Sequence, residues 1–413
     1  MTNRHLARVA SAFIFLVSVA TVAAEDAPKS GNPVVDKTVE IVDRNFFSVA
    51  ALPQFHAAVG AVVADAAATG QPIVTDDAVN RILASLKASH TGRYTADQVD
   101  YYELSNVFRY GLRNSLRRLF PPDGEVTYDG IGIASKKTGG GLFITDVYDG
   151  GPAARAGLTV GDEILSADRK PFAEIGSFKG KAGQSVDLEI RRRAADTPAM
   201  IAVGVEKIKP LETFLKAITD SVKVIDRDGR KIGVVHLWSY TSDEVTGILN
   251  RELATRLADV DGLILDLRSR WGGAPGDAAE AFVGGTADMK VIDHDGDTHY
   301  INTRFRKPMV AIIDEGTRSG MEILAYSLKK NGIPLVGAAT AGDVLAASAY
   351  NLPDDSLLEI AVADVVVDGK QLEANPVTPD IAVAFDVRYA AGTDPQMDAA
   401  LTELGRRLPE GVN

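Results

Sequence analysis

The chain has 413 residues, of which 46% are apolar and 24% are charged, so it is long enough for two or three packed domains and is not disordered as its main state. The formal net charge of −12 argues against nucleic acid and anionic membranes as partners, because phosphate binding needs clustered Lys and Arg. The lack of cysteine excludes disulfides and thiol catalysis.

The first residues have the layout of a secretory signal. Arg4 and Arg8 precede an apolar run from Val9 to Ala24 that ends in small residues, and an acidic pair follows it. A membrane anchor is the alternative, but about 16 apolar residues are short for a span that needs ~20. We therefore predict that residues 1–24 are removed and that the mature protein is exported, with a bacterial periplasm as the expected destination. No later stretch is expected to cross a bilayer.

Residues 25–124 have a helical pattern, with apolar residues at three- and four-residue spacing. Asp76 and Asp77 stand where caps of a helix are expected. The expected helices include Val39–Val42, Val79–Leu86 and a third from Ala96 to Phe120, which ends at two prolines.

Short β-rich runs separated by Gly, Pro and Asp turns fill residues 125–207 and predict a small β module. From residue 208 to 390, strands alternate with helices, which predicts an α/β domain with a largely parallel sheet. Residues 391–413 are expected to form a C-terminal helical tail. The expected strands of the α/β domain are Ile232–Leu237, Gly262–Leu267, Met309–Ile313 and Leu335–Val336. The predicted fold class is therefore mixed α/β with a helical N-terminal region and an inserted β-rich domain.

The run Gly130-Ile131-Gly132-Ile133, followed by Gly151–Leu158 and Gly161–Leu165, resembles the PDZ domains of secreted proteases. Such a loop can turn consecutive backbone N–H groups toward a terminal carboxylate, and the strand after it can offer an edge to an extended peptide. Gly130, Ile131, Gly132 and Ile133 are thus predicted to bind the C-terminal tail of a protein or peptide substrate. The alternative is a closed β-barrel in which these glycines are merely structural.

The segment Met309–Ala325 has the pattern of a strand, a tight turn and a helix. Ser319 falls at or near the first turn of this helix, where N–H groups and the helix dipole favour developing negative charge. A serine in this place can also be a simple N-cap.

The same segment resembles the nucleophile region of the carboxyl-terminal processing (tail-specific) serine proteases, whose motif is Asn/Asp-x-Gly-Ser-Ala-Ser-Ala-Ser-Glu-Ile. Aligned on Glu322-Ile323, the resemblance implies that Ser319 is the nucleophile. Leu263–Gly273 is similar to the Leu-Asp-Leu-Arg-x-x-x-Gly-Gly motif of that family. This implies that Gly272 or Gly273, together with the N–H of Gly320, binds the oxyanion, because glycine leaves room for the attacked carbonyl.

One part of the family pattern is missing. The commonest form uses a lysine base in a Thr-Phe-Gly-Lys-Gly turn, with a glutamine four residues later, whereas the matching positions here hold Asp343 and Ala347. A Ser–Lys dyad is therefore absent. Aspartate is a weak base, with a reference pKa of ~3.9.

A different base is implied by Leu86–Thr91, which resembles the Ser-His segment of the tricorn core protease and its relatives. There the histidine is the general base, so the resemblance assigns this role to His90, and a pKa of ~6.5 suits it. Leu372–Ile381 is similar to a Val-Glu-x-x-Gly-Val-x-Pro-Asp-Ile segment, with Pro376 replacing the glycine, which implies that Glu373 orients the imidazole. Taken alone, His90 would be a helix-dipole partner and Glu373 a surface residue.

These patterns predict a secreted serine endopeptidase with a Ser-His-Glu site that cleaves protein or peptide chains through an acyl-enzyme. The alternative is a catalytically silent relative that binds peptides with its PDZ groove and with the cleft that holds the active site in active relatives. Asp343 and Ala347 favour the alternative, whereas His90 and Glu373 favour the enzyme. No cofactor, metal, nucleic acid or membrane partner is expected after signal cleavage. The physiological substrate and the oligomeric state stay open.

Overall fold

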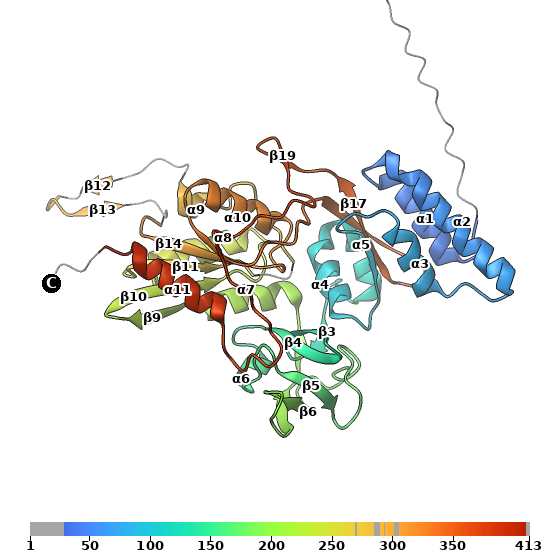
Figure 1. Cartoon of the computed structure of the whole chain (residues 1–413), viewed down its shortest axis with the longest axis horizontal. Helices are drawn as coiled ribbons and strands as arrows, with labels where there is room; N and C mark the ends of the chain where they lie inside the picture. Colours follow the sequence, from blue (N-terminus) through green and yellow to red (C-terminus); the bar gives the residue numbers. More distant parts are fainter. Residues whose placement is uncertain (1–28, 269–270, 285–289, 293, 301–304, 410–413) are drawn as a thin grey trace, which may run out of the picture.

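The computed structural model describes residues 29–268, 271–284, 290–292, 294–300 and 305–409. The predicted signal at residues 1–24 lies outside this part. Figure 1 shows N-terminal helices on one side, a β-rich module below, and a sheet with helices on the other side. The predicted mixed α/β fold class is confirmed.

The N-terminal region consists of helices α1 (Pro33–Asn45), α2 (Leu52–Thr69), α3 (Thr75–Ala84), α4 (Val99–Val107) and α5 (Arg109–Leu119), with a short 3-10 turn η1 (Val49–Ala51) before α2. The single helix expected over Ala96–Phe120 is wrong, since Phe108 leaves the helical region (φ −91°, ψ 17°) and separates α4 from α5. This break allows apolar residues of both helices to join one buried cluster. The prediction that Asp76 and Asp77 are caps is also wrong. They lie in the first turn of α3, where negative charge suits the helix dipole.

A three-stranded sheet joins the N-terminal region to the second half of the chain. Strand β1 (Gly92–Tyr94) pairs antiparallel with β17 (Leu357–Ala363), which pairs with β16 (Ala346–Asn351). One face of β17, with Leu358 and Ile360, packs on α1–α3, while Leu357 packs among α4 and α5. The pairing places His90, just before β1, beside the α/β domain.

The β-rich module contains β2 (Tyr128–Gly130), β3 (Ile133–Thr138), β4 (Gly141–Val147), α6 (Pro152–Arg155), β5 (Glu163–Ala167), β6 (Ser185–Arg191), β7 (Ala199–Gly204) and β8 (Glu206–Ile208). Its five-stranded sheet has the order β3-β4-β5-β6-β7, so β3 is an edge strand. The core between its elements includes Ile144, Val186 and Leu188, all fully buried.

The α/β domain is built on a six-stranded sheet of order β20-β15-β14-β11-β10-β9. All neighbours are parallel except β9 and β10, which confirms a largely parallel sheet. Helices α7, α8 and α10 pack on one face, and α11 covers the other. The bounds are α7 (Pro210–Ser221), β9 (Lys223–Arg227), β10 (Arg230–His236), α8 (Glu244–Ala254), β11 (Gly262–Asp266), α9 (Glu280–Val283), β14 (Met309–Ile313), α10 (Gly320–Lys330), β15 (Leu335–Gly337), β20 (Ile381–Ala382) and α11 (Pro395–Arg407). Two small hairpins are β12 (Lys290–Ile292) with β13 (Thr298–Tyr300) and β18 (Val366–Val367) with β19 (Lys370–Gln371).

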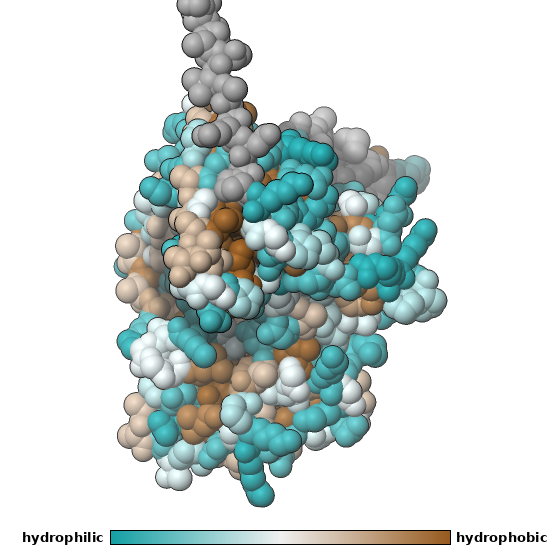
Figure 2. Space-filling model, turned by 90° about the vertical axis from the view of Figure 1, so that its right-hand side faces the viewer, coloured by the Kyte–Doolittle hydropathy of each residue, from teal (hydrophilic) through white to brown (hydrophobic). Residues whose placement is uncertain are grey.

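By length and composition, one helix after the signal could cross a bilayer, so the expectation that no such stretch exists is wrong. The 21 residues Val49–Thr69 reach a mean hydropathy of 1.3 in their most apolar window, 17% of which is buried. Alanine and valine give this value without a continuous run of large apolar residues. Phe55, Val59 and Val62 on α2 pack into the cluster that holds α1 and α3, so the helix is weak evidence for a span. Figure 2 shows this side of the molecule, on which apolar and hydrophilic residues are interspersed.

Candidate active site

A cavity of about 310 Å³ lies where the N-terminal helices, the β16–β17 hairpin and the loops of the α/β domain meet. Of the predicted catalytic residues, His90, Ser319 and Gly273 line this cavity. Asp343 and Ala347, which occupy the positions of the lysine and the glutamine, line it as well. Segments far apart in sequence thus supply one site.

Ser319 stands in the turn between β14 and α10. Its backbone has φ 56° and ψ −131°, a region that residues with a side chain rarely adopt. The Ser319 N–H donates to the carbonyl of Asp343 at 2.8 Å, which holds the turn in place. Ser319 is the N-cap residue, yet its side chain caps no N–H of α10. Its hydroxyl therefore remains available on the cavity wall.

The glycine loop after β11 packs directly on this turn. Gly272 and Gly273 have φ of +53° and +66°, and a Cβ on Gly272 would lie 2.7 Å from the Cβ of Ser319. A Cβ on Gly320 would lie 2.8 Å from the carbonyl carbon of Gly273. Only glycine permits so close an approach. Within the described part of the chain, the N–H groups of Gly273 and Gly320 meet no hydrogen-bond acceptor, so they can serve an oxyanion.

His90 and Glu373 are connected through Ser89, a residue that the sequence reasoning did not single out. The Ser89 hydroxyl donates to Glu373 Oε2 at 2.9 Å and lies 2.9 Å from His90 Nδ1. Because the hydroxyl has one proton, Nδ1 of His90 must be the donor of the second hydrogen bond. Nε2 is then the nitrogen with a lone pair. The signal for Ser89 was its place in the Ser-His pair of the quoted motif.

Glu373 is held by backbone donors from two segments. It accepts hydrogen bonds from the N–H groups of Ser89 (3.1 Å), Val344 (2.8 Å) and Leu345 (3.3 Å). The Pro376 substitution does not disturb this arrangement. On either side of it, Ala374 N–H donates to the carbonyl of Gly342 at 2.8 Å, and Val377 N–H donates to the Thr340 hydroxyl at 2.8 Å.

The electrostatic environment suits a neutral imidazole. Burial lowers the pKa of His90, an effect that the charge of Asp343 opposes and that of Arg318 increases. A histidine with a lowered pKa is unprotonated near neutral pH, as a general base must be. No hydrogen bond joins His90 to Ser319 here, although both line the cavity.

Asp343 has a structural part in the site. Its carboxylate lies 3.6 Å from the guanidinium of Arg318, and its N–H donates to Glu322 Oε2 at 2.8 Å. Buried Glu322 also accepts from the Thr340 hydroxyl (2.5 Å) and the Gly342 N–H (2.8 Å). The loop that carries a lysine in the commonest family form is therefore tied to α10 by a carboxylate.

Gly130, Ile131, Gly132 and Ile133 line a second cavity of about 90 Å³ in the β-rich module. Gly132 has φ +74°, and Ile133 begins the edge strand β3. The start of α4 also lines this cavity, where the Val99 N–H donates to Glu174 Oε2 at 3.3 Å. The predicted peptide-binding residues thus lie together, apart from the predicted catalytic ones.

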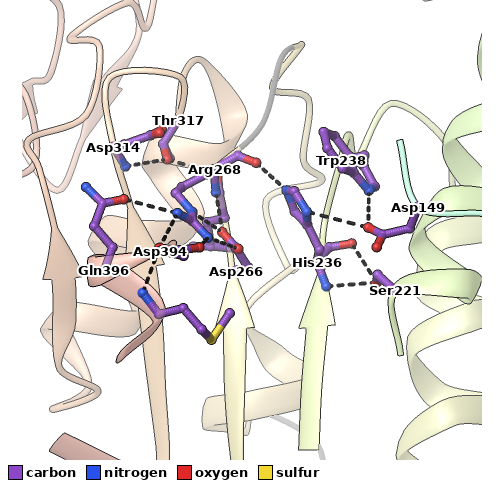
Figure 3. A network of polar contacts seen from close by, with 12 residues as sticks. Asp149, Ser221, His236, Trp238, Asp266, Arg268, Asp314, Thr317, Asp394 and Gln396 are labelled. Carbon is purple, nitrogen blue, oxygen red and sulfur yellow. Dashed lines mark hydrogen bonds and ion pairs between the residues drawn. The ribbon is translucent and has the colours of Figure 1, made fainter. Parts of the chain in front are cut away.

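A polar network joins the β-rich module to the α/β domain (Figure 3). Trp238 Nε1 donates to Asp149 Oδ2 at 3.1 Å, and His236 Nε2 lies 2.5 Å from the carbonyl oxygen of Arg268. The Arg268 guanidinium pairs with Asp266 (2.6 Å) and Asp394 (2.7 Å). The contact with Asp149 ties the segment after β10 to the module, and the Arg268 pairs tie the end of β11 to the segment before α11. No group of three or more His, Asp or Glu in the described part of the chain could hold a metal ion.

Two family models match the chain: peptidase family S41 over residues 231–383 and the PDZ domain over residues 143–192. Carboxyl-terminal-processing peptidase 3, chloroplastic, of Arabidopsis thaliana is 28% identical over 304 residues, which cover 68% of this chain and 57% of that protein. Carboxy-terminal processing protease CtpA of Bacillus subtilis (strain 168) is 22% identical over 272 residues, which cover 62% of this chain and 56% of that protein. The match thus spans less than two thirds of these relatives.

Among solved structures, a photosystem II D1 C-terminal processing protease is 20% identical, with a TM-score of 0.49 over 89% of this chain and 97% of that chain. The two family models and the curated relatives confirm the resemblance read from the motifs. Residues 231–383 are thus similar to peptidase family S41, and residues 143–192 are similar to PDZ domains.

Proposed function

We propose that this protein is an exported serine endopeptidase that cleaves protein or peptide chains through an acyl-enzyme. The observation that supports this most is the shared cavity of Ser319, His90 and Gly273. Export rests on the sequence of residues 1–24, and N-terminal sequencing of the mature protein should find Glu25 as the first residue.

In this mechanism, His90 Nε2 takes the proton of the Ser319 hydroxyl as its oxygen attacks the scissile carbonyl. The N–H groups of Gly320 and the Gly272-Gly273 loop stabilise the oxyanion. Glu373 stabilises the imidazolium through Ser89. The imidazolium then gives its proton to the leaving amine, and a water molecule repeats the sequence to release the acyl group.

The PDZ domain would bind the C-terminal tail of the substrate. The backbone N–H groups of Gly130–Ile133 would hold the terminal carboxylate, and the peptide would pair with the free edge of β3. Binding of matched peptides with a free or an amidated C-terminus tests this by calorimetry. The acid should bind more tightly, and equal affinities would contradict carboxylate recognition.

A catalytically silent peptide-binding relative is the second candidate. It is favoured by Asp343 and Ala347 at the positions of the lysine and glutamine and by the lack of a hydrogen bond between His90 and Ser319. Both candidates share the fold, so chemistry must separate them.

The test is cleavage of an unstructured polypeptide and labelling by a serine-directed phosphonate. Ser319→Ala should lower the rate by a factor of about 10³ or more, while its fold is retained because loss of a cap residue costs only ~1 kcal/mol. Ser327→Ala is the matched control, since this α10 hydroxyl donates to the Ile323 carbonyl outside the cavity. Wild-type protein that neither cleaves nor is labelled would establish the binding protein instead.

A further inference from the structure

One buried carboxyl on the cavity wall has no part in the mechanism above. Glu359 lies in the middle of β17, is 4% exposed, and lines the same cavity as Ser319 and His90. Its partners across the sheet are Gly92 on β1 and Ala349 on β16, and the Tyr94 side chain lies over Gly92. The sheet thus presents an acidic group between two small residues.

Glu359 has few partners for a buried carboxyl. Among the described residues, the hydrogen-bond donor found for it is the Tyr94 hydroxyl, at a long 3.3 Å. A carboxylate can accept about four hydrogen bonds, and burying it without donors or a cation is costly. Accordingly, burial raises the pKa of Glu359 to about 7.

No ion pair is found for Glu359 among the described residues, although the Arg318 charge opposes the rise of its pKa. Of the described residues that line the cavity, Arg318 is the one permanent cation, and it pairs with Asp343 at 3.6 Å. His90 is kept neutral by burial. The rest of the wall includes the apolar side chains of Leu104, Val107 and Phe108. The cavity can therefore take a long side chain with an apolar stem and a cationic end.

We propose that Glu359 sets the substrate specificity by binding a lysine or arginine side chain of the residue whose carbonyl Ser319 attacks. This rests on the proposed peptidase function. The alkyl stem packs on the apolar wall, and the ammonium or guanidinium group supplies the donors and the charge that Glu359 lacks. Glu359 touches the substrate but takes no part in the bond-making steps.

Peptides that differ at this one residue test the proposal. Wild-type kcat/KM should be at least tenfold higher for lysine or arginine than for norleucine, which has the stem without the charge. Glu359→Gln should remove this preference, so that the lysine, arginine and norleucine peptides are hydrolysed with similar kcat/KM. Glu280→Gln, which removes the same charge from an exposed position on α9, should keep the preference. Preference retained in Glu359→Gln, or no basic preference in wild type, would overturn the proposal.

A binding measurement without turnover separates this inference from the proposed function. Benzamidine, a small aromatic cation, should bind the folded Ser319→Ala protein, and adding Glu359→Met or Glu359→Gln should weaken binding at least tenfold in calorimetry. If wild type cleaves no peptide, the peptidase function fails, and the cation site is judged by benzamidine alone. Benzamidine affinity independent of Glu359 would refute the site even in an active enzyme.

Discussion

Two histidines in this molecule lie near carboxylates, in two different regions. His90 reaches Glu373 through Ser89 and lines the cavity that holds Ser319. His236 lies in the junction shown in Figure 3, where Nε2 contacts the Arg268 carbonyl and Nδ1 is 3.9 Å from Asp149. Its ring also packs on Trp238, with centroids 3.8 Å apart.

The difference shows what a carboxylate beside an imidazole does and does not establish. At the junction, both nitrogens of His236 are directed at partners of the fold, so the ring holds two domains together. At the cavity, the hydrogen bond to Ser89 uses one nitrogen of His90 and leaves the other for a reaction. A nearby hydroxyl on a strained turn, not the carboxylate, distinguishes the candidate catalytic histidine.

The largest effect is expected when His90 is removed. His90→Ala should lower kcat by a factor of about 10³ or more, because the proposed mechanism assigns to His90 the transfer of the Ser319 proton. Peptide hydrolysis under saturating substrate measures this, with circular dichroism as the check on folding. Activity close to wild type would show that another group is the general base, and the two histidines would then not differ in catalytic role.

The Ser89 and Glu373 contacts should have an intermediate effect. Glu373→Gln and Ser89→Ala should each lower kcat/KM about 10- to 100-fold, because the imidazolium loses its stabilising partner and Nδ1 loses its acceptor. The double variant should be little worse than either single variant, since both act through one chain of hydrogen bonds. Additive losses would show that Glu373 acts on the reaction independently of Ser89.

Much of this site could be read from contiguous patterns. The strand, turn and helix around Ser319 and the Gly272-Gly273 loop each come from one continuous segment. The structure has the strand and the helix on either side of Ser319, as the sequence pattern predicts. The motif resemblances supplied His90 and Glu373, but the pairing of β1 with β17 that places His90 was not predictable. It depends on a register between distant segments that no local pattern specifies.

Ser89 and Glu359 were missed for different reasons. A serine beside a histidine has many ordinary uses, and its bridging contact exists only after folding. Glu359 interrupts an apolar strand in Leu357–Ala363, which was a signal that went unused. Which face of that strand meets the cavity depends on tertiary packing.

The pH dependence of kcat/KM tests the lowered pKa of His90, and the expected effect is smaller than those of the substitutions above. Because burial lowers the pKa of His90, kcat/KM should stay high below pH ~6.5 and fall only when the pH drops through the lowered pKa. A norleucine peptide is the right substrate, since it does not engage Glu359. Asp343→Asn should leave hydrolysis measurable and move the acid limb to still lower pH, because the Asp343 charge raises the pKa of His90. A shift to higher pH would contradict this electrostatic account.

The smallest catalytic effect is expected at the junction. His236→Gln should change kcat/KM less than about threefold, because His236 touches neither Ser319 nor the cavity that holds it. It should lower the free energy of unfolding by about 1 kcal/mol, the usual cost of a lost hydrogen bond, and more where a buried carbonyl is left unpaired. Urea unfolding followed alongside hydrolysis separates the two quantities. A loss of activity comparable to that of His90→Ala, with stability unchanged, would mean that the contact between the PDZ module and the strand ends controls the reaction, and the two histidines would then differ in position but not in importance.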